Sequence, residues 1–257
     1  MKYLYMWLCL GFTTFTHAQP TAFKWREEVR NKYIGVNISA SRYCGDLSER
    51  YNFAHLQLGW SIEAHMRYRL HERWTVGGDV GVYHVYADQR YTQNADNYLN
   101  FAATNFSANS KVQWDMLSVG ENLRNVLYLF TGLGATALAP LTELNGTTYS
   151  LPAFKTEGKS YALWVAQFSY GMGFPMALGA STQLNIEGRY THVLSDHLDD
   201  VSTYYVDKLT VSVVERSLAD KRVAEGLPQN PSGAMRGNAT KNDGYFLFTL
   251  QIIHKFR

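Results

Sequence analysis

The sequence predicts an all-β fold, an eight-stranded antiparallel up-and-down transmembrane barrel with a cleaved N-terminal signal peptide. Three observations predict it: apolar and polar residues alternate with a period of two, the alternating segments number eight, and their connections are alternately long and short. Successive side chains of a strand point to opposite faces, so each strand has one apolar and one polar face. An even number of strands with every second connection long is typical of outer-membrane barrels, which have short periplasmic turns and long external loops.

The clearest alternation lies in residues 55–71, where Trp60 and Ile62 fall on one face and Ser61 and Glu63 on the other. Further strands are expected at residues 33–41, 73–86, 112–121, 126–139, 163–175, 183–191 and 245–256. The long connections are residues 42–54, 87–111, 140–162 and 194–244, which would place Asn105 and Asn230 in external loops. The tight connections are residues 71–73, 122–125 and 176–180.

The composition restricts the classes of function. The chain has 257 residues, with 24 Lys and Arg against 22 Asp and Glu, so it has no excess of basic residues for binding nucleic acid. After residue 15, no stretch approaches the roughly 20 apolar residues that a membrane-spanning helix needs. An aromatic content of 14% argues against disorder.

Residues 1–18 have the pattern of a secretory signal peptide. Lys2 gives a positive start, residues 3–15 are almost wholly apolar or small, and Ala18 provides a cleavage position. A buried N-terminal helix is the alternative. We therefore expect a signal peptide at 1–18 and an outer-membrane barrel domain at 19–257. The mature chain would contain one cysteine, Cys44, and hence no internal disulfide.

Alternation alone also fits a soluble, lipocalin-like barrel. Aromatic residues at the ends of the apolar faces, such as Trp60 with Tyr68 and Trp74 with Tyr86, favour a membrane barrel because aromatic girdles mark both membrane interfaces. The last strand also alternates down to a near-terminal aromatic, Phe256. The lipid bilayer of the outer membrane is therefore the expected environment.

Eight strands enclose an interior that is just wide enough for the barrel's own side chains, so a porin is not expected. The polar faces carry charged residues of both signs, which could neutralise one another in a narrow lumen. This predicted lumen network consists of Glu63, Arg67, Asp79, Glu187 and Arg189.

Ser61, Glu63 and His65 share one face of a strand, and a serine, a base and a carboxylate are the components of nucleophilic catalysis. However, residues two apart on a strand lie roughly 6–7 Å apart, and the sequence shows no oxyanion site. A buried polar ladder is the preferred interpretation. The sequence therefore predicts no catalytic residue, no cofactor and no small-molecule substrate.

Asp196, Asp199 and Asp200 form an acidic cluster whose oxygens could bind calcium in a loop. The spacing lacks the ligand pattern of an EF-hand, and side-chain capping of backbone amides is the alternative. No metal site is predicted, and calcium binding by these three residues stays an open question.

Four passages together resemble one family: residues 41–47 (SRYCGDL), 154–158 (FKTEG), 199–205 (DDVSTYY), and Arg236-Gly237 followed by residues 242–245 (NDGY). In this order they resemble the PorG-type outer-membrane protein of the Bacteroidota type IX secretion system, and the resemblance covers essentially the whole mature chain. It implies a non-enzymatic component that contacts a periplasmic ring built by a lipoprotein and its soluble partner. The motif residues that it singles out are Gly45, Asp46, Asp199, Asp200, Ser202, Arg236 and Gly237.

The expected location is the outer membrane, with both termini in the periplasm and the long loops outside the cell. Residues 19–32 precede the first strand and contain Trp25 and Arg26, two residue types that are enriched among interface anchors, so both are candidate partner contacts. One alternative function is an adhesin-type barrel that binds an external ligand through its long loops, especially residues 194–244. The other is a small outer-membrane hydrolase.

Overall fold

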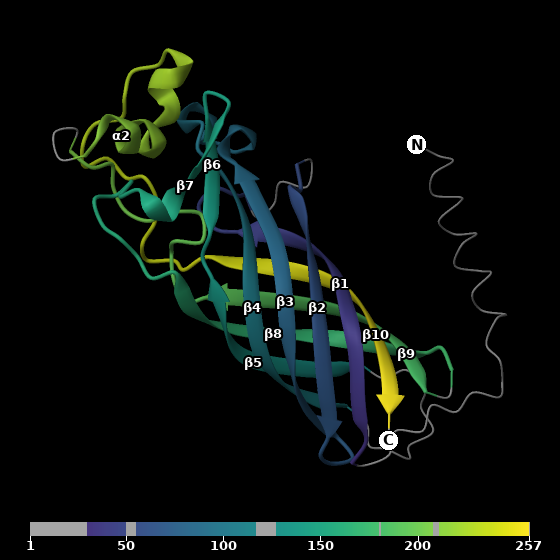
Figure 1. Ribbon diagram of the computed structural model, residues 1–257. Helices are drawn as coiled ribbons and strands as arrows, with labels where there is room; N and C mark the ends of the chain where they lie inside the picture. Colours follow the sequence, from purple (N-terminus) through teal and green to yellow (C-terminus); the bar gives the residue numbers. More distant parts are fainter. Residues whose placement is uncertain (1–29, 50–54, 117–126, 180, 208–210, 257) are drawn as a thin grey trace, which may run out of the picture.

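Eight long antiparallel strands form a closed ring in the computed structural model (Figure 1), which describes residues 30–49, 55–116, 127–179, 181–207 and 211–256. In ring order they are β1 (Lys32–Cys44), β2 (Leu58–Arg69), β3 (Trp74–Asp88), β4 (Asn100–Asp115), β5 (Tyr128–Ala137), β8 (Trp164–Ala177), β9 (Thr182–Val193) and β10 (Gly244–Phe256). β1 pairs with β10 and closes the ring. The predicted eight-stranded antiparallel barrel is confirmed. The predicted signal peptide, like Trp25 and Arg26, lies outside the described residues.

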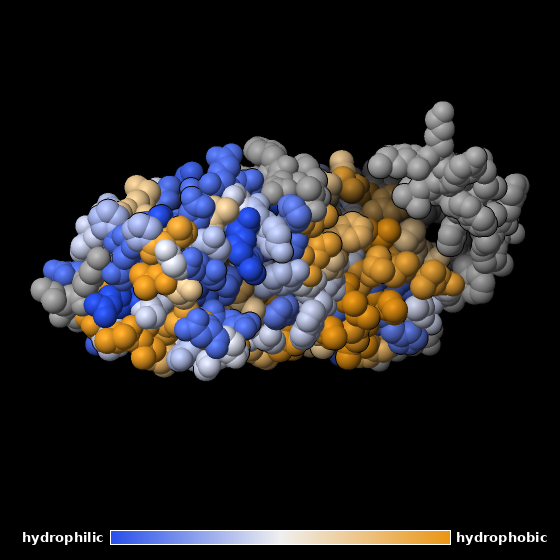
Figure 2. Space-filling model, turned by 90° about the horizontal axis from the view of Figure 1, so that it is seen from above, coloured by the Kyte–Doolittle hydropathy of each residue, from blue (hydrophilic) through white to orange (hydrophobic). Residues whose placement is uncertain are grey.

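The alternation sorts side chains between the two faces of the ring. On β2, Ile62 and Met66 point outward and are 50% and 61% exposed, whereas Glu63 and Arg67 point inward and are 2% and 3% exposed. The surface over the barrel is accordingly hydrophobic, and the opposite end of the molecule is mainly hydrophilic (Figure 2). No helix in the described part of the chain has the length and hydrophobicity needed to cross a membrane.

The long connections gather at one end of the barrel, here called the loop end (Figure 1). They contain the hairpin β6 (Pro140–Leu144) and β7 (Thr147–Ser150), and the helix α2 (Val213–Ala219). They also contain the short helices η1 (Gln89–Tyr91), η2 (Ala95–Asn97), η3 (Leu151–Ala153) and η4 (Lys221–Glu225). The opposite end, here called the turn end, has the tight connections between β2 and β3 and between β8 and β9. The third predicted tight connection, residues 122–125, is outside the described residues.

The hydrophobic core lies at the loop end. It combines inward residues from the strand ends, such as Val85 and Leu247, with loop residues such as Leu47, Leu99 and Leu198, all between 0% and 2% exposed. Loop side chains therefore pack onto the barrel interior and close it at this end.

One strand was predicted wrongly. β4 begins at Asn100, whereas the alternation had placed residues 87–111 in a loop. The outward residues of its first half include Ala102, Thr104 and Ala108, which are small or polar and make the apolar face hard to recognise. Asn105, expected in an external loop, lies inside the barrel at 0% exposure and donates to Tyr83 Oη.

Candidate functional site

The lumen contains charged side chains contributed by different strands. Arg67 Nη2 of β2 lies 2.5 Å from Asp79 Oδ1 of β3. Arg189 of β9 donates to Glu63 of β2, and its Nη1 lies 3.7 Å from Asp79 Oδ2. All four side chains are at most 4% exposed. Arg189 therefore connects strands on either side of β1 and β10.

A second ion pair completes this lumen network. Lys111 Nζ of β4 donates to Glu187 Oε1 of β9, which also accepts from Tyr128 Oη at 2.7 Å. The ammonium lies 3.7 Å from the centre of the Phe130 ring, a distance typical of a cation–π contact. Lys111 was missing from the predicted network because the start of β4 had been assigned to a loop.

The lumen network brings together the five predicted residues and Lys111, three cations and three anions in all. Amide side chains fill the space beside it: Gln251 donates to Asn37 at 2.8 Å, and Asn37 donates to Glu63 Oε2 at 3.1 Å. Because ion pairs and amides occupy the interior and a hydrophobic core closes one end, the lumen is filled by the chain itself.

The structure does not connect Ser61, Glu63 and His65 into a catalytic triad. Both carboxylate oxygens of Glu63 contact other residues, Arg189 and Asn37. Within the described residues, Ser61 Oγ and both ring nitrogens of His65 have no hydrogen-bond partner. A serine that lacks a base cannot be activated as a nucleophile.

A second polar group, the mouth cluster, lies at the loop end and consists of Tyr43, Asp46, Asp196, Asp199 and Asp243. Tyr43 Oη at the end of β1 lies 2.6 Å from Asp199 Oδ2 and 2.7 Å from Asp243 Oδ1. The remaining oxygen of each carboxyl accepts a backbone amide, from Val201 at 2.8 Å and from Leu198 at 3.0 Å. The cluster therefore joins β1, β10 and the loop between β9 and β10.

Burial dominates the electrostatics of the mouth cluster. It raises the pKa of Asp199 and that of Asp243 well above the ordinary value, and neighbouring carboxyls add to both shifts. Burial also raises the pKa of Asp196 to about 8. The pKa of Asp46 is raised by burial even though Asp46 accepts the backbone amide of Asn238. Burial thus shifts all four carboxyl groups of the mouth cluster toward their protonated forms.

Arg236 ties two long loops together beside the mouth cluster. Its Nη1 lies 2.8 Å from Glu157 Oε1, and its Nη2 lies 3.5 Å from Asp200 Oδ2. Glu157 also accepts the backbone amides of Ser202 at 2.8 Å and of Thr203 at 3.0 Å. Burial opposes ionisation of Glu157, but Arg236 and these hydrogen bonds hold its pKa below the ordinary value.

The motif residues are thereby placed in one region, the cap over the loop end. Two of them are glycines at close approaches: a Cβ on Gly45 would lie 2.0 Å from Asp243 Oδ1, and one on Gly237 would lie 2.6 Å from Asp46 Oδ2. Tyr43 and Asp243 were not among the predicted residues. Tyr43 lies in the passage 41–47 and Asp243 in the passage 242–245. The two residues are 200 positions apart, and only the folded chain shows that they meet.

The acidic residues considered as calcium ligands have separate partners. Asp199 contacts Tyr43, whereas Asp200 Oδ2 accepts from Thr156 Oγ1 at 2.6 Å. Across the described ranges, no three His, Cys, Asp or Glu side chains are arranged to hold a metal ion.

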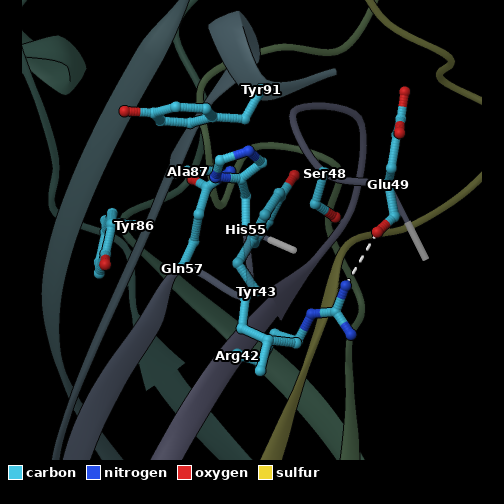
Figure 3. Close-up of a pocket in the computed structure, with 10 residues that line it drawn as sticks. Arg42, Tyr43, Ser48, Glu49, His55, Gln57, Tyr86, Ala87 and Tyr91 are labelled. Carbon is cyan, nitrogen blue, oxygen red and sulfur yellow. Dashed lines mark hydrogen bonds between the residues drawn. The ribbon is translucent and has the colours of Figure 1, made fainter. Parts of the chain in front are cut away.

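A small pocket lies on the rim of the barrel next to the mouth cluster, with which it shares Tyr43 (Figure 3). His55 stacks on Tyr91 with ring centroids 4.6 Å apart, and Arg42 Nη2 donates to the carbonyl oxygen of Glu49 at 2.8 Å. The aromatic stack links the first long loop to η1, which follows β3, and the arginine links the same loop to β1.

No family model matches the chain, and no curated protein matches its sequence. Among solved structures, the chain is similar to Neisserial surface protein A at 13% identity and a TM-score of 0.47, over 88% of this chain and 97% of that one. It is similar to outer membrane protein OprG from Pseudomonas aeruginosa at 11% identity and 0.47, over 91% and 99%. For Ail, the attachment invasion locus protein of Yersinia pestis, the values are 10% and 0.45, over 89% and 100%. Identities this low and TM-scores below 0.5 decide nothing about this chain, whose closed antiparallel barrel follows from its own strand pairing.

Proposed function

We propose that the protein is a non-enzymatic outer-membrane barrel that serves the type IX secretion machinery as an anchor or contact for its periplasmic ring. The observation that carries the proposal is the filled interior. Ion pairs and a hydrophobic core of buried side chains occupy the described interior, and no described residues form a catalytic arrangement. The function then resides on the surfaces at the two ends.

The outer face supports a membrane location. Exposed Trp60 and Trp164 lie at the loop end of their strands, and Trp74 and Trp114 are paired across β3 and β4 at the turn end. Trp60 and Tyr68 are eight residues apart on β2, which corresponds to about 26 Å along the strand and, with a typical strand tilt, to about 20 Å along the barrel axis. This is close to the ~25 Å apolar band of outer-membrane barrels.

The resemblance to the PorG-type family is what supports the secretion role. The four motif passages lie in separate loops, and their residues meet in one buried cap at the loop end. The folded cap therefore gives the four passages one common structural role. The ends of β1 and β10 also meet at the turn end, where Lys32 is aligned with Phe256. With the loop end outside the cell, the chain ends face the periplasm, where a ring lipoprotein and its soluble partner would be reached.

The test is co-purification from outer membranes in mild detergent. Trp25→Ala combined with Arg26→Ala should weaken binding of the two ring proteins, because the loss of one interface anchor costs about 2 kcal/mol or more, roughly thirty-fold in affinity. Asp96→Ala, at an exposed carboxylate of the loop end, is the matched control. Full retention by the double variant would move the contact to the turns, and the absence of both ring proteins from the native preparation would refute the proposal.

The second candidate is a surface-binding barrel, which is favoured by the size and ordered structure of the loop end. Its surface carries exposed apolar side chains, among them Tyr204 at 56% and Met235 at 68%. These two residues form an isolated bridge that joins the two ends of the segment 207–232, and this segment is the one to replace by a short Gly-Ser linker. A secretion anchor should keep its periplasmic partners after this replacement, whereas an adhesin should lose binding to its external ligand.

A further inference from the structure

The mouth cluster contains more hydrogen-bond contacts than its ionised form could make. Tyr43 Oη lies within hydrogen-bonding distance of two carboxyl oxygens, Asp199 Oδ2 at 2.6 Å and Asp243 Oδ1 at 2.7 Å. A phenol has a single O–H to donate, and an ionised carboxylate can only accept. If both carboxylates were ionised, one of the two contacts would join two oxygens with no hydrogen between them. One of the carboxyl groups must therefore hold a proton and donate it to Tyr43.

The surroundings do not provide an alternative way of neutralising the pair. Asp199 and Asp243 are both at most 1% exposed, and the carboxyls of Asp46 and Asp196 act on them in the direction that opposes ionisation. A buried charge is costly unless it is paired with an opposite charge or neutralised by a proton. The proton inferred from the hydrogen bonds is thus also the expected neutralising species.

The other titratable groups that face the cluster are phenols, or cations that interact with other carboxylates. Tyr83 of β3 and Tyr161 of the third long loop are phenols, and burial raises the pKa of Tyr161, with Asp200 and Asp199 adding to the shift. Two cations of the surrounding loops interact with other carboxylates: Lys241 lowers the pKa of Asp46, and Arg236 pairs with Glu157 and Asp200.

The pair also holds the loop backbone. Asp243 accepts the amide of Leu198, and Asp199 accepts the amide of Val201, so residues 196–202 are fastened to the start of β10 and to the end of β1 through carboxyl groups. Two like charges at this position would repel each other in a buried site, where electrostatic interactions are strong.

We propose that Asp199 and Asp243 share one proton through Tyr43, and that the loss of this proton at alkaline pH releases the loop segment 196–202 from the barrel mouth. The cap is then a pH-sensitive element of the surface at the loop end, closed at neutral pH and opened under alkaline conditions. This inference stands apart from the proposed secretion role, because it depends only on the contacts within the chain.

The direction of the pKa shifts decides how the stability of the cap depends on pH. A carboxyl whose pKa is higher in the folded cap than in an open loop stabilises the cap at low pH, and this contribution is lost as the pH rises through the raised pKa. Burial raises the pKa of Asp196 to about 8, so Asp196 ionises just above neutral pH. The shared proton of Asp199 and Asp243, whose pKa values are raised well above the ordinary value, is lost as the pH rises further.

The experiment uses the full chain in lipid nanodiscs and two readouts between about pH 6 and about pH 10, a range above the ordinary pKa of an aspartate. Infrared difference spectroscopy should show the carbonyl band of a buried carboxylic acid at neutral pH, reduced in Asp243→Asn. Amide hydrogen exchange, corrected for the intrinsic rate, should show protection of Leu198 and Val201 falling at least tenfold with rising pH. In Asp243→Asn, which removes one of the two like charges, that fall should be absent.

Asp199→Asn is the second variant, in case Asp243→Asn does not fold, and Asp96→Asn, at an exposed loop carboxylate, is the matched control that should behave as the native chain. The proposal is overturned if the native protein shows no protonated carboxyl at neutral pH. It is equally overturned if that band appears only after a chelator is added, because a bound cation would then be the neutralising species. Protection that is independent of pH in the native chain would also refute it.

Discussion

Removal of Glu187 tests the lumen network most directly. Its carboxylate accepts from Lys111 Nζ and from Tyr128 Oη, and both Glu187 and Lys111 are at most 3% exposed. Glu187→Ala leaves the Lys111 ammonium buried without its anion. Breaking a buried pair in this way costs about 3–5 kcal/mol of folding free energy, a change of between roughly one hundred and several thousand fold in the folding equilibrium.

Gln183→Ala on the same strand is the matched control. Gln183 is also buried, but it donates one neutral hydrogen bond, to Asn185 Oδ1 at 2.6 Å. Loss of such a bond costs about 1 kcal/mol. Denaturant unfolding in detergent micelles, followed by tryptophan fluorescence and by heat-modifiable gel mobility, gives both free energies by linear extrapolation.

A double variant separates the ion pair from general damage to packing. Lys111→Met with Glu187→Gln removes both charges of this pair, and replacing a buried pair by uncharged side chains is often close to neutral. The double variant should therefore recover most of the stability that Glu187→Ala loses. Equal costs for Glu187→Ala and Gln183→Ala would show that the pair does not form and that the description of the lumen is wrong.

Two further predictions concern the ends of the barrel. In a Cys44→Ser background, a cysteine replacing Asn230 should react with an impermeant reagent on intact cells and one replacing Glu72 should not; the reverse pattern would invert the topology. Arg236→Gln should make the long loops more sensitive to added protease at neutral pH. In the native protein the same loosening should appear as the pH falls through the lowered pKa of Glu157, because a carboxylate with a depressed pKa stabilises the fold only while it is ionised, and protection that persists in acid would contradict this.

The barrel itself was predictable because its signal is local. Alternation with a period of two is visible within a dozen residues, as in β2, and it assigns Glu63 and Arg67 to the interior without any knowledge of their partners. The start of β4 was missed because this local signal is weak there. Where the outward residues are small or polar, as at Ala102 and Thr104, the local contrast that marks a strand disappears, and only pairing with β3 and β5 identifies it.

The sequence by itself determined the class of fold, the number of strands, the end at which the long loops gather and the polarity of the lumen, since each depends on residue order along a strand or loop. Only the tertiary structure decided which charges pair, because ring closure sets the partners: Arg189 reaches Glu63 across 126 positions. It likewise decided that Tyr43, Asp199 and Asp243 meet at the barrel mouth, where loops separated by 156 and 200 positions bury their carboxyls together. Burial and proximity are properties of the folded chain, so the electrostatics of the mouth cluster had no counterpart in the sequence pattern.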